Sequence, residues 1–318
     1  MKILLTISLI ALSLCTLAQS SITTETLQLV VQQATLRGTL TIPASNQKMP
    51  VALIIAGSGA TDQNGNSLGS PFQSNSYKLL AEALAAKGIA SLRYDKRGIG
   101  QSSSQQTESQ VRFDDFAADA SALLEQLKKD PRFSSVYIIG HSEGSLLGML
   151  AAQKTPVAGY ISLAGPGRAA DVVLLEQLSP QVTPAMLEEI KRVLGSLKNG
   201  QTIPSQQIKL PAQLVNLLFR DSVQPYLISW FAYDPATEIK KLKTRVMVVQ
   251  GSTDIQVSLT DASLLAAAIG QPASIVTNMN HTLKTATLEP ASQNTAYTDP
   301  SLALHPDLLP MLEQFIKP

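Results

Sequence analysis

The sequence predicts an α/β fold: a mostly parallel sheet with helices on both faces, interrupted once by a helical insertion. Short apolar, β-branched runs alternate with segments of helical periodicity over residues 51–163 and again over 245–316. Between these two parts, residues 168–235 contain helix-like segments and several prolines but no convincing strand. This combination favours one large domain with an inserted cap.

The composition fits a globular protein with a large core. The chain has 318 residues, of which 44% are hydrophobic and 15% are charged, and its formal net charge is +1. A chain of this length can form one large α/β domain with an insertion. Its nearly neutral charge gives no reason to expect nucleic acid or an acidic surface as a partner.

The first 18 residues are predicted to be a signal peptide, which leaves residues 19–318 as the mature domain. Lys2 precedes an apolar stretch that is too short for a confident membrane span, and a small-residue cleavage site ends at Ala18. We therefore expect export to the periplasm or the medium, with no membrane span in the mature chain. Cys15 is the only cysteine, so cleavage after Ala18 excludes intramolecular disulfides. Lipoprotein processing before Cys15 is the alternative, although the preceding residue is not small.

The elements before residue 168 are predicted from their periodicity and from the residues that end them. Residues 24–42 contain two segments rich in Thr, Leu and Val, which suggests an N-terminal hairpin. Tyr77, Leu80 and Leu84 share one side of a predicted helix, and Gly88 supplies its C-terminal stop. The same two patterns predict strands over 51–56, 89–94, 136–139 and 157–163, and helices over 76–87, 113–129 and 145–152.

The chain changes character after residue 167. Five prolines break residues 168–234, and Thr183 followed by Pro184 is a good N-cap and first-turn proline for a helix. A helical insertion within an alternating sheet is typical of a lid or cap, whereas a separate helical domain is the alternative that its short length disfavours. The sheet then resumes, with strands predicted over 245–250 and 274–277 and helices over 258–269 and 306–316.

Residues 140–144, Gly-His-Ser-Glu-Gly, lie between a predicted strand and a predicted helix. A serine on such a turn, with glycine two residues away on each side, is typical of a nucleophile elbow. Larger side chains at the flanking positions would collide with neighbouring strand or helix. The turn also holds the hydroxyl clear of the sheet, beside the positive end of a helix. We therefore interpret Ser142 as a nucleophile rather than as part of an ordinary glycine–serine turn.

A serine nucleophile needs a general base, and a carboxylate should orient that base. Of the three histidines, His141 adjoins the serine on a turn that directs it elsewhere, and His305 has no strand end to place it. His281 follows a short predicted strand in a loop that can reach the serine, so we predict it as the base. Asp254 lies just beyond the C-terminal end of the strand over 245–250 and fits the chain order serine, acid, histidine. A turn aspartate is its alternative reading, and Asp171 is the second candidate acid.

A tetrahedral intermediate carries a negative oxygen that needs two N–H donors. We predict the backbone N–H of Glu143, directly after the nucleophile, and that of Ser58, in a glycine-containing loop after the strand over 51–56. Gly59 is the alternative to Ser58. The Glu143 side chain suits the first turn of a helix, with binding of a cationic amine as the weaker reading. We expect neither a cofactor nor a metal for this chemistry.

Five motifs occur together: residues 55–59, 94–102, 140–144, 250–254 and 280–281. Jointly they make the stretch from about residue 24 to 318 resemble the α/β-hydrolase superfamily, specifically bacterial secreted esterases close to the serine-aminopeptidase-like (S33-type) branch. The resemblance implies a triad of Ser142, Asp254 and His281 and a helical cap at about 168–235. Relatives often have a histidine before the oxyanion-loop glycine, and this chain departs from that pattern with Ala56.

These residues together predict hydrolysis of a small-molecule carboxylic ester of short or medium acyl chain through an acyl-enzyme. A peptidase, an aminopeptidase or a thioesterase on the same triad is the alternative; a binding protein that kept the fold is disfavoured because every triad position is filled. The insertion carries an apolar stripe, which we interpret as a packing face more readily than as an acyl-binding wall. Its members are Leu214, Leu217, Leu218, Phe219, Tyr226, Leu227, Trp230 and Phe231.

Overall fold

The computed structural model describes residues 22–317, so the predicted signal peptide, with Ala18 and Cys15, lies outside the described residues. Within that range the chain forms one mixed sheet in the order β1-β2-β4-β3-β6-β7-β8-β9, with the short β5 paired to β2. β2 is antiparallel to both β1 and β4, and the pairs from β4 through β9 are parallel. The strands are β1 (Thr23–Val31), β2 (Ala34–Ile42), β3 (Met49–Ile55), β4 (Ala90–Tyr94), β5 (Ser103–Ser104), β6 (Phe133–His141), β7 (Gly159–Leu163), β8 (Arg245–Gly251) and β9 (Ser274–Val276).

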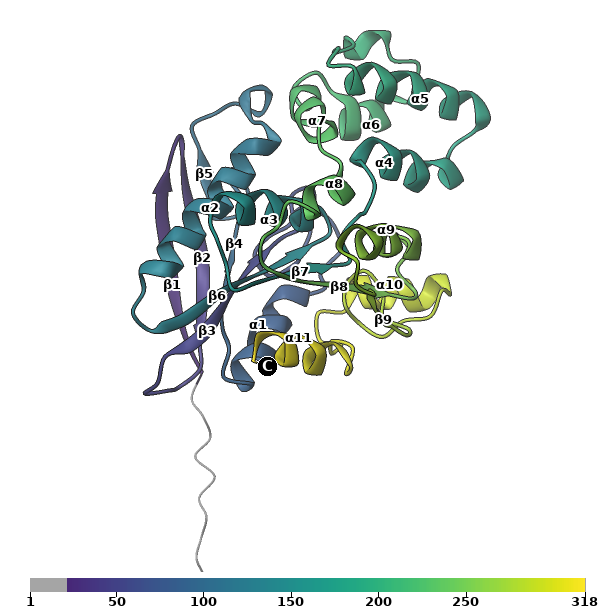
Figure 1. Ribbon diagram of the computed structural model, residues 1–318. Coiled ribbons are helices and arrows are strands. Elements are labelled where there is room, and N and C mark those ends of the chain that lie inside the picture. The colour runs from purple at the N-terminus through teal and green to yellow at the C-terminus, as the bar shows by residue number, and fades with distance from the viewer. Residues whose placement is uncertain (1–21, 318) are drawn as a thin grey trace, which may run out of the picture.

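Helices cover both faces of this sheet, which confirms the predicted fold class (Figure 1). α1 (Ser76–Ala86) and α11 (Leu308–Ile316) lie together on one face, and α2 (Phe113–Lys129), α3 (Glu143–Lys154) and α9 (Leu259–Ile269) pack on the other. Because successive strand side chains point to opposite faces, β3 contributes to both cores. Val51, Leu53 and Ile55 pack with α2 and α3, whereas Ala52 and Ile54 pack with α1. Burial on both faces explains why this strand is an almost continuous apolar run.

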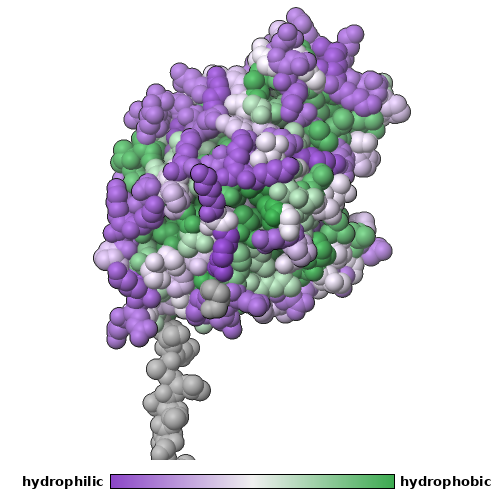
Figure 2. Space-filling view, in the orientation of Figure 1, coloured by the Kyte–Doolittle hydropathy of each residue, from purple (hydrophilic) through white to green (hydrophobic). Residues whose placement is uncertain are grey.

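The insertion lies between β7 and β8 and is made of helices, with no strand among its described residues (Figure 1). Thr183 caps α5 by accepting a hydrogen bond from the Met186 N–H at 3.4 Å, and Pro184 is the first residue of that helix, as the sequence predicts. Polar side chains cover much of its outer surface, with apolar side chains between them (Figure 2). Its elements are α4 (Ala170–Leu178), the 3₁₀ turns Ser179–Gln181 and Ser205–Gln207, α5 (Pro184–Lys198), α6 (Ala212–Leu214), the π-helical turn Val215–Phe219, α7 (Gln224–Phe231) and α8 (Pro235–Ile239).

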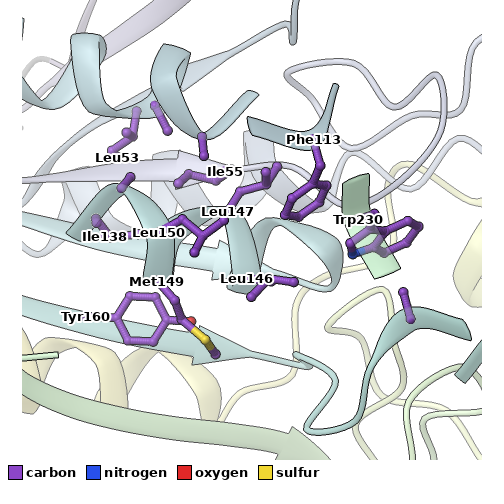
Figure 3. Packing of buried hydrophobic residues seen from close by; sticks show 14 of the residues in the cluster. Leu53, Ile55, Phe113, Ile138, Leu146, Leu147, Met149, Leu150, Tyr160 and Trp230 are labelled. Atoms are coloured by element: carbon purple, nitrogen blue, oxygen red, sulfur yellow. The ribbon is translucent and has the colours of Figure 1, made fainter. Parts of the chain in front are cut away.

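Aromatic packing joins the insertion to the body of the domain. The Trp230 ring of α7 stacks on Phe113 at the start of α2, with ring centroids 5.7 Å apart and 7° between the planes (Figure 3). Tyr226, one turn earlier on α7, contacts both Phe113 and Phe116. Such a stack buries large apolar rings and stabilises their mutual orientation. Most of the predicted apolar stripe therefore packs, but Leu217 is 69% exposed.

Sequence patterns missed one helix in the C-terminal part, α10 (Pro290–Thr298). Its buried residues are Gln293 and Ala296, so it has none of the large apolar side chains whose spacing reveals a helix. A 3₁₀ turn at Glu108–Gln110 was also missed. None of the helices within residues 22–317 combines the length and hydropathy needed to cross a bilayer.

Candidate active site

The predicted site residues follow the carboxyl ends of parallel strands, which meet at one edge of the sheet. Ser58 follows β3, Ser142 follows β6, Asp254 follows β8, and His281 comes after β9. The strand order reverses at β3, because the next strand of the chain pairs on one side and β6 pairs on the other. α1 and α3 then leave on opposite faces. A crevice for ligands opens at such a point.

Ser142 has the strained backbone expected of a tight strand-to-helix turn. Its φ and ψ are 54° and −125°, a region that residues other than glycine rarely occupy. The two flanking glycines are sterically required. A Cβ on Gly140 would lie 2.4 Å from the Gly144 carbonyl oxygen, and a Cβ on Gly144 would lie 2.2 Å from the Ile55 carbonyl oxygen. The turn therefore exists because two glycines let α3 and β3 approach the serine.

Asp254 and His281 are hydrogen-bonded to each other. His281 Nδ1 lies 2.8 Å from Asp254 Oδ2, which also accepts from Gln250 Nε2 at 2.9 Å. Asp254 Oδ1 accepts the backbone N–H groups of Gln256 at 2.8 Å and Val257 at 3.0 Å. The carboxylate is fully buried. Four donors converge on its two oxygens, so its orientation is fixed.

These contacts set the charge of Asp254 and the tautomer of His281. Burial by itself would raise the pKa of Asp254, but the His281 ring and two backbone amides outweigh it and hold that pKa below its ordinary value. A carboxylate only accepts, so the proton of a neutral His281 sits on Nδ1, which leaves Nε2 as the acceptor.

His281 and Ser142 line the same pocket. Within residues 22–317 no hydrogen bond from the Ser142 hydroxyl meets ordinary distance and angle limits, which is common in unliganded sites. The structure thus pairs Asp254 with His281, and Ser142 lines the same pocket as His281. Asp171, the second candidate acid, lies in α4 of the insertion and pairs instead with Lys198, with Oδ1 and Nζ 3.2 Å apart.

A chain of neutral hydrogen bonds runs behind the pocket. The Gly57 N–H donates to the Tyr77 hydroxyl at 3.0 Å, and that hydroxyl lies 2.7 Å from His141 Nδ1. His141 Nε2 lies 2.9 Å from the carbonyl oxygen of His281. Since Tyr77 accepts from Gly57 it donates to Nδ1, and His141 donates from Nε2 to the carbonyl. Burial, with a smaller effect of the His281 ring, lowers the pKa of His141 to about 3, so the ring is neutral at pH 7.

The two predicted oxyanion donors differ in their surroundings. Glu143 is the first residue of α3, where backbone N–H groups have no partner within the helix. Ser58 is exposed and lines the pocket together with Gly57. Among the described residues, neither amide donates a backbone hydrogen bond. Both amides are therefore available to a bound oxygen atom.

Sequence reasoning missed the partners of the Glu143 side chain. The carboxylate is buried and pairs with Lys96, with Oε1 2.9 Å from Nζ, and its Oε2 accepts from the Tyr226 hydroxyl at 2.7 Å. Glu143 does lie in the first turn of α3, as the sequence suggested, but its carboxylate also has two specific partners there. Lys96 belongs to a motif that the sequence singled out, but only its three-dimensional position reveals the pair. Tyr226 was visible only as one member of an apolar stripe.

The pocket has a volume of about 870 Å³, which is ample for a small organic ligand. Its described lining contains no Asp, Glu, Lys or Arg side chain. Among residues 22–317, no group of three or more His, Cys, Asp or Glu side chains is arranged to hold a metal ion. The pocket lining also includes four apolar side chains that are exposed to solvent: Phe72, Leu217, Ile255 and Leu288.

This chain resembles known proteins in sequence. A family model described as serine aminopeptidase, S33, matches residues 69–283. Esterase EstD of Thermotoga maritima is 27% identical over 232 residues, which are 72% of this chain, and the match spans only 52% of EstD.

Solved structures share the fold at lower identity. The α/β hydrolase GrgF from Penicillium sp. superposes with a TM-score of 0.60 at 17% identity, over 93% of this chain and 98% of GrgF. Est1E from Butyrivibrio proteoclasticus with bound ferulic acid gives 0.56 at 18% identity, over 85% and 96% of the two chains. The family resemblance drawn from the five motifs is thereby confirmed.

Proposed function

Because this chain belongs to the serine aminopeptidase S33 family of α/β-hydrolases, we propose that it is a serine hydrolase that cleaves neutral carboxylic esters through an acyl-enzyme. The observation that carries the proposal is the hydrogen bond between His281 and the buried Asp254, beside a serine on a strained turn. The similarity to EstD, which is itself called an esterase, supports the same reaction class.

In the proposed reaction, Ser142 Oγ attacks the ester carbonyl carbon while His281 Nε2 takes its proton. Asp254 stays ionised and stabilises the imidazolium that forms. The carbonyl oxygen becomes an oxyanion, which accepts hydrogen bonds from the backbone N–H groups of Glu143 and Ser58. Collapse of the intermediate expels the alcohol, which leaves with the proton from His281. Water activated by the same histidine then attacks the acyl-enzyme and releases the acid.

The uncharged pocket favours an ester over an aminopeptidase substrate. A free α-ammonium group would need a carboxylate in the pocket, and the described lining provides none. Glu143 is the nearest candidate in the sequence, but both of its oxygens are taken by Lys96 and Tyr226. The apolar side chains around the opening suit a short or medium acyl chain.

Initial rates on p-nitrophenyl acetate, butyrate and octanoate, with Ser142→Ala as the control, test this proposal. We expect hydrolysis by the wild type and a loss of at least about 10³-fold in the variant, as for other serine nucleophiles. Cleavage of aminoacyl p-nitroanilides in preference to the esters would instead establish the peptidase alternative. Absence of both activities would favour the binding-protein reading.

A further inference from the structure

Lys96 and Glu143 form a fully enclosed ion pair next to the proposed nucleophile. Their side chains are 3% and 2% exposed, and Lys96 Nζ lies 2.9 Å from Glu143 Oε1. The desolvation of two charges offsets much of their attraction, so a buried ion pair is weak evidence of a stabilising role. Lys96 is the second residue after the end of β4, and Glu143 is the first residue of α3. The pair therefore joins two loops at the catalytic edge of the sheet.

The Lys96 ammonium makes a second short contact, to the backbone beside the predicted oxyanion hole. Its Nζ donates to the Gly57 carbonyl oxygen at 2.7 Å. That carbonyl belongs to the same peptide group as the Ser58 N–H, and in a planar trans peptide the two point in opposite directions. Holding the Gly57 oxygen towards Lys96 thus directs the Ser58 N–H away from Lys96. Hydrogen bonding to the carbonyl also polarises the peptide group, which makes its N–H a stronger donor.

Two networks therefore hold the two sides of Gly57. The Gly57 N–H donates to the Tyr77 hydroxyl of the neutral chain, and the Gly57 carbonyl oxygen accepts from Lys96 of the ion pair. Together these contacts leave the loop little freedom to rotate its peptide groups. Ser58 itself is exposed on the pocket wall, so nothing on its own side chain supplies this restraint.

Tyr226 extends the ionic pair to the insertion. Its hydroxyl donates to Glu143 Oε2 at 2.7 Å, and its ring lies edge-on to Phe116 with centroids 5.7 Å apart. The Lys96 ammonium lies 5.4 Å from the centroid of the same Phe116 ring. The insertion thus contacts Glu143 directly through Tyr226, and the Phe116 ring of α2 lies against both Tyr226 and the Lys96 ammonium.

We propose that Lys96 is a positioning residue for the oxyanion hole, which orients the Gly57–Ser58 peptide, and that Glu143 and Tyr226 hold Lys96 in place from the nucleophile turn and from the insertion. This inference rests on the proposed ester hydrolysis. It assigns the Glu143 carboxylate a task separate from that of its backbone N–H.

The test uses Lys96→Met in the full chain, with p-nitrophenyl butyrate as the substrate. Loss of one oxyanion donor costs about 10²- to 10³-fold in kcat. A donor that is misdirected rather than removed should cost about 10- to 100-fold, with KM changed less than about threefold. The Ki of a trifluoromethyl ketone, whose adduct places an oxyanion in the hole, should rise by the same factor as kcat/KM falls.

The double variant Lys96→Met/Glu143→Met separates positioning from stability. It leaves no buried unpaired charge, so its thermal midpoint should recover relative to Lys96→Met alone. The kcat defect should remain, because the Gly57 carbonyl still lacks its donor. Recovery of both the midpoint and kcat would overturn the proposal. Tyr226→Phe keeps the ion pair and should lower kcat by a smaller factor, about three- to tenfold.

Arg97→Met is the matched control. Arg97 and Asp119 form an ion pair with the same exposures, 3% and 2%, and a 2.6 Å separation between Nη2 and Oδ1. Among residues 22–317, the hydrogen bonds of Arg97 go to Asp119, Gln106 and the Asp115 carbonyl rather than to the oxyanion loop. We expect this variant to lose thermal stability while kcat stays within about threefold. An equal loss of kcat in Arg97→Met and Lys96→Met would overturn the positioning role. An inactive wild type overturns the proposed function itself, whereas an active wild type with an unaffected Lys96→Met overturns only this inference.

Discussion

The body of the domain and its helical insertion surround the same pocket, but they are built differently. In the body, the groups at the site are held by close packing and hydrogen bonds. The backbone packs tightly at the glycines of the serine turn, and four donors surround the Asp254 carboxylate. The insertion reaches the buried network near the site through one hydroxyl, that of Tyr226, and contributes the exposed Leu217 to the pocket. The difference suggests that the body determines the chemistry, while the insertion adjusts it and selects the substrate.

The anchoring of the insertion supports this division. Its base on α7 is held by the stack of Trp230 on Phe113 and by Ser229 Oγ, which accepts the Phe113 N–H at 2.8 Å. The π-helical turn that carries Leu217 lies further out, and its side chain is 69% exposed. Local stability follows the density of buried contacts. Substitutions in the body should therefore have larger effects than substitutions in the insertion.

The largest effect on activity is expected for Asp254→Asn in the body. An amide in place of the carboxylate disturbs the tautomer of His281 and no longer stabilises its charged form, so kcat should fall about 10³- to 10⁴-fold. Asp171→Asn is the control, since Asp171 pairs with Lys198 in the insertion, and kcat should change less than about threefold. Steady-state rates on p-nitrophenyl butyrate measure both. Comparable losses in the two variants would remove the distinction between body and insertion.

The second prediction compares one glycine from each region by urea denaturation. Gly144→Ala places a Cβ 2.2 Å from a backbone oxygen of β3 and should cost several kcal/mol, on the order of 3 or more. Gly195→Ala, in α5 of the insertion, meets no atom within 4 Å. There the substitution should stabilise the helix by about 0.5–1 kcal/mol. A tolerated Gly144→Ala would show that the serine turn is not as closely packed as described.

The third prediction concerns pH and the neutral network behind the pocket. His141 has a pKa of about 3 in the folded protein and an ordinary value near 6.5 when unfolded. The unfolded chain therefore binds one more proton between these values, and stability falls as pH drops below about 6.5. In that pH window, His141 contributes about 1.4 kcal/mol per pH unit to the slope of the free energy of unfolding against pH.

His141→Gln removes this titration, so the free energy of unfolding should depend less steeply on pH than in the wild type, by up to that slope. Denaturant titrations at pH 5.0, 6.0 and 7.5 measure the difference. Equal slopes in the two proteins would mean that His141 is not held neutral by the fold.

The smallest effect is expected at the outer surface of the insertion. Leu217→Ala removes an exposed apolar side chain from the pocket wall, so KM for p-nitrophenyl octanoate should rise about two- to fivefold, with KM for the acetate unchanged. Leu264→Ala, on a partly exposed leucine of α9 outside the pocket lining, should change neither. An effect on acetate equal to that on octanoate would place Leu217 outside the acyl side of the pocket.

Sequence alone predicted the buried strands and the serine turn better than it predicted a helix whose buried face is small or polar, for physical reasons. Buried parallel strands and the glycine–serine turn leave strong local patterns, because close packing restricts which residues fit. β3 and α3 were therefore predicted to within two residues at each end, whereas β6 was found but predicted as 136–139 rather than Phe133–His141. α10 was missed because its buried face is made by Gln293 and Ala296 rather than by large apolar residues.

At the site, likewise, some residues could be predicted from local patterns and others could not. Ser142, Asp254 and His281 are marked by their places at strand ends, and the structure puts them at one edge of the sheet. The pairing of Lys96 with Glu143 joins residues 47 apart in the sequence, and that of Glu143 with Tyr226 joins residues 83 apart. No local pattern encodes such a contact, since a buried charge looks like a surface charge until its partner is known. His141 is buried, and its link from Tyr77 to His281 was not predicted.

The central claim, that Ser142 is the nucleophile of a serine hydrolase, is tested most directly by covalent labelling. The protein is treated with diethyl p-nitrophenyl phosphate, and the adduct is quantified by intact mass and located by peptide mapping. The account predicts one diethylphosphoryl group per chain, on Ser142, with ester hydrolysis lost in proportion to labelling. Hydrolysis that persists after complete labelling of Ser142, or inactivation through an adduct on another residue, would contradict it.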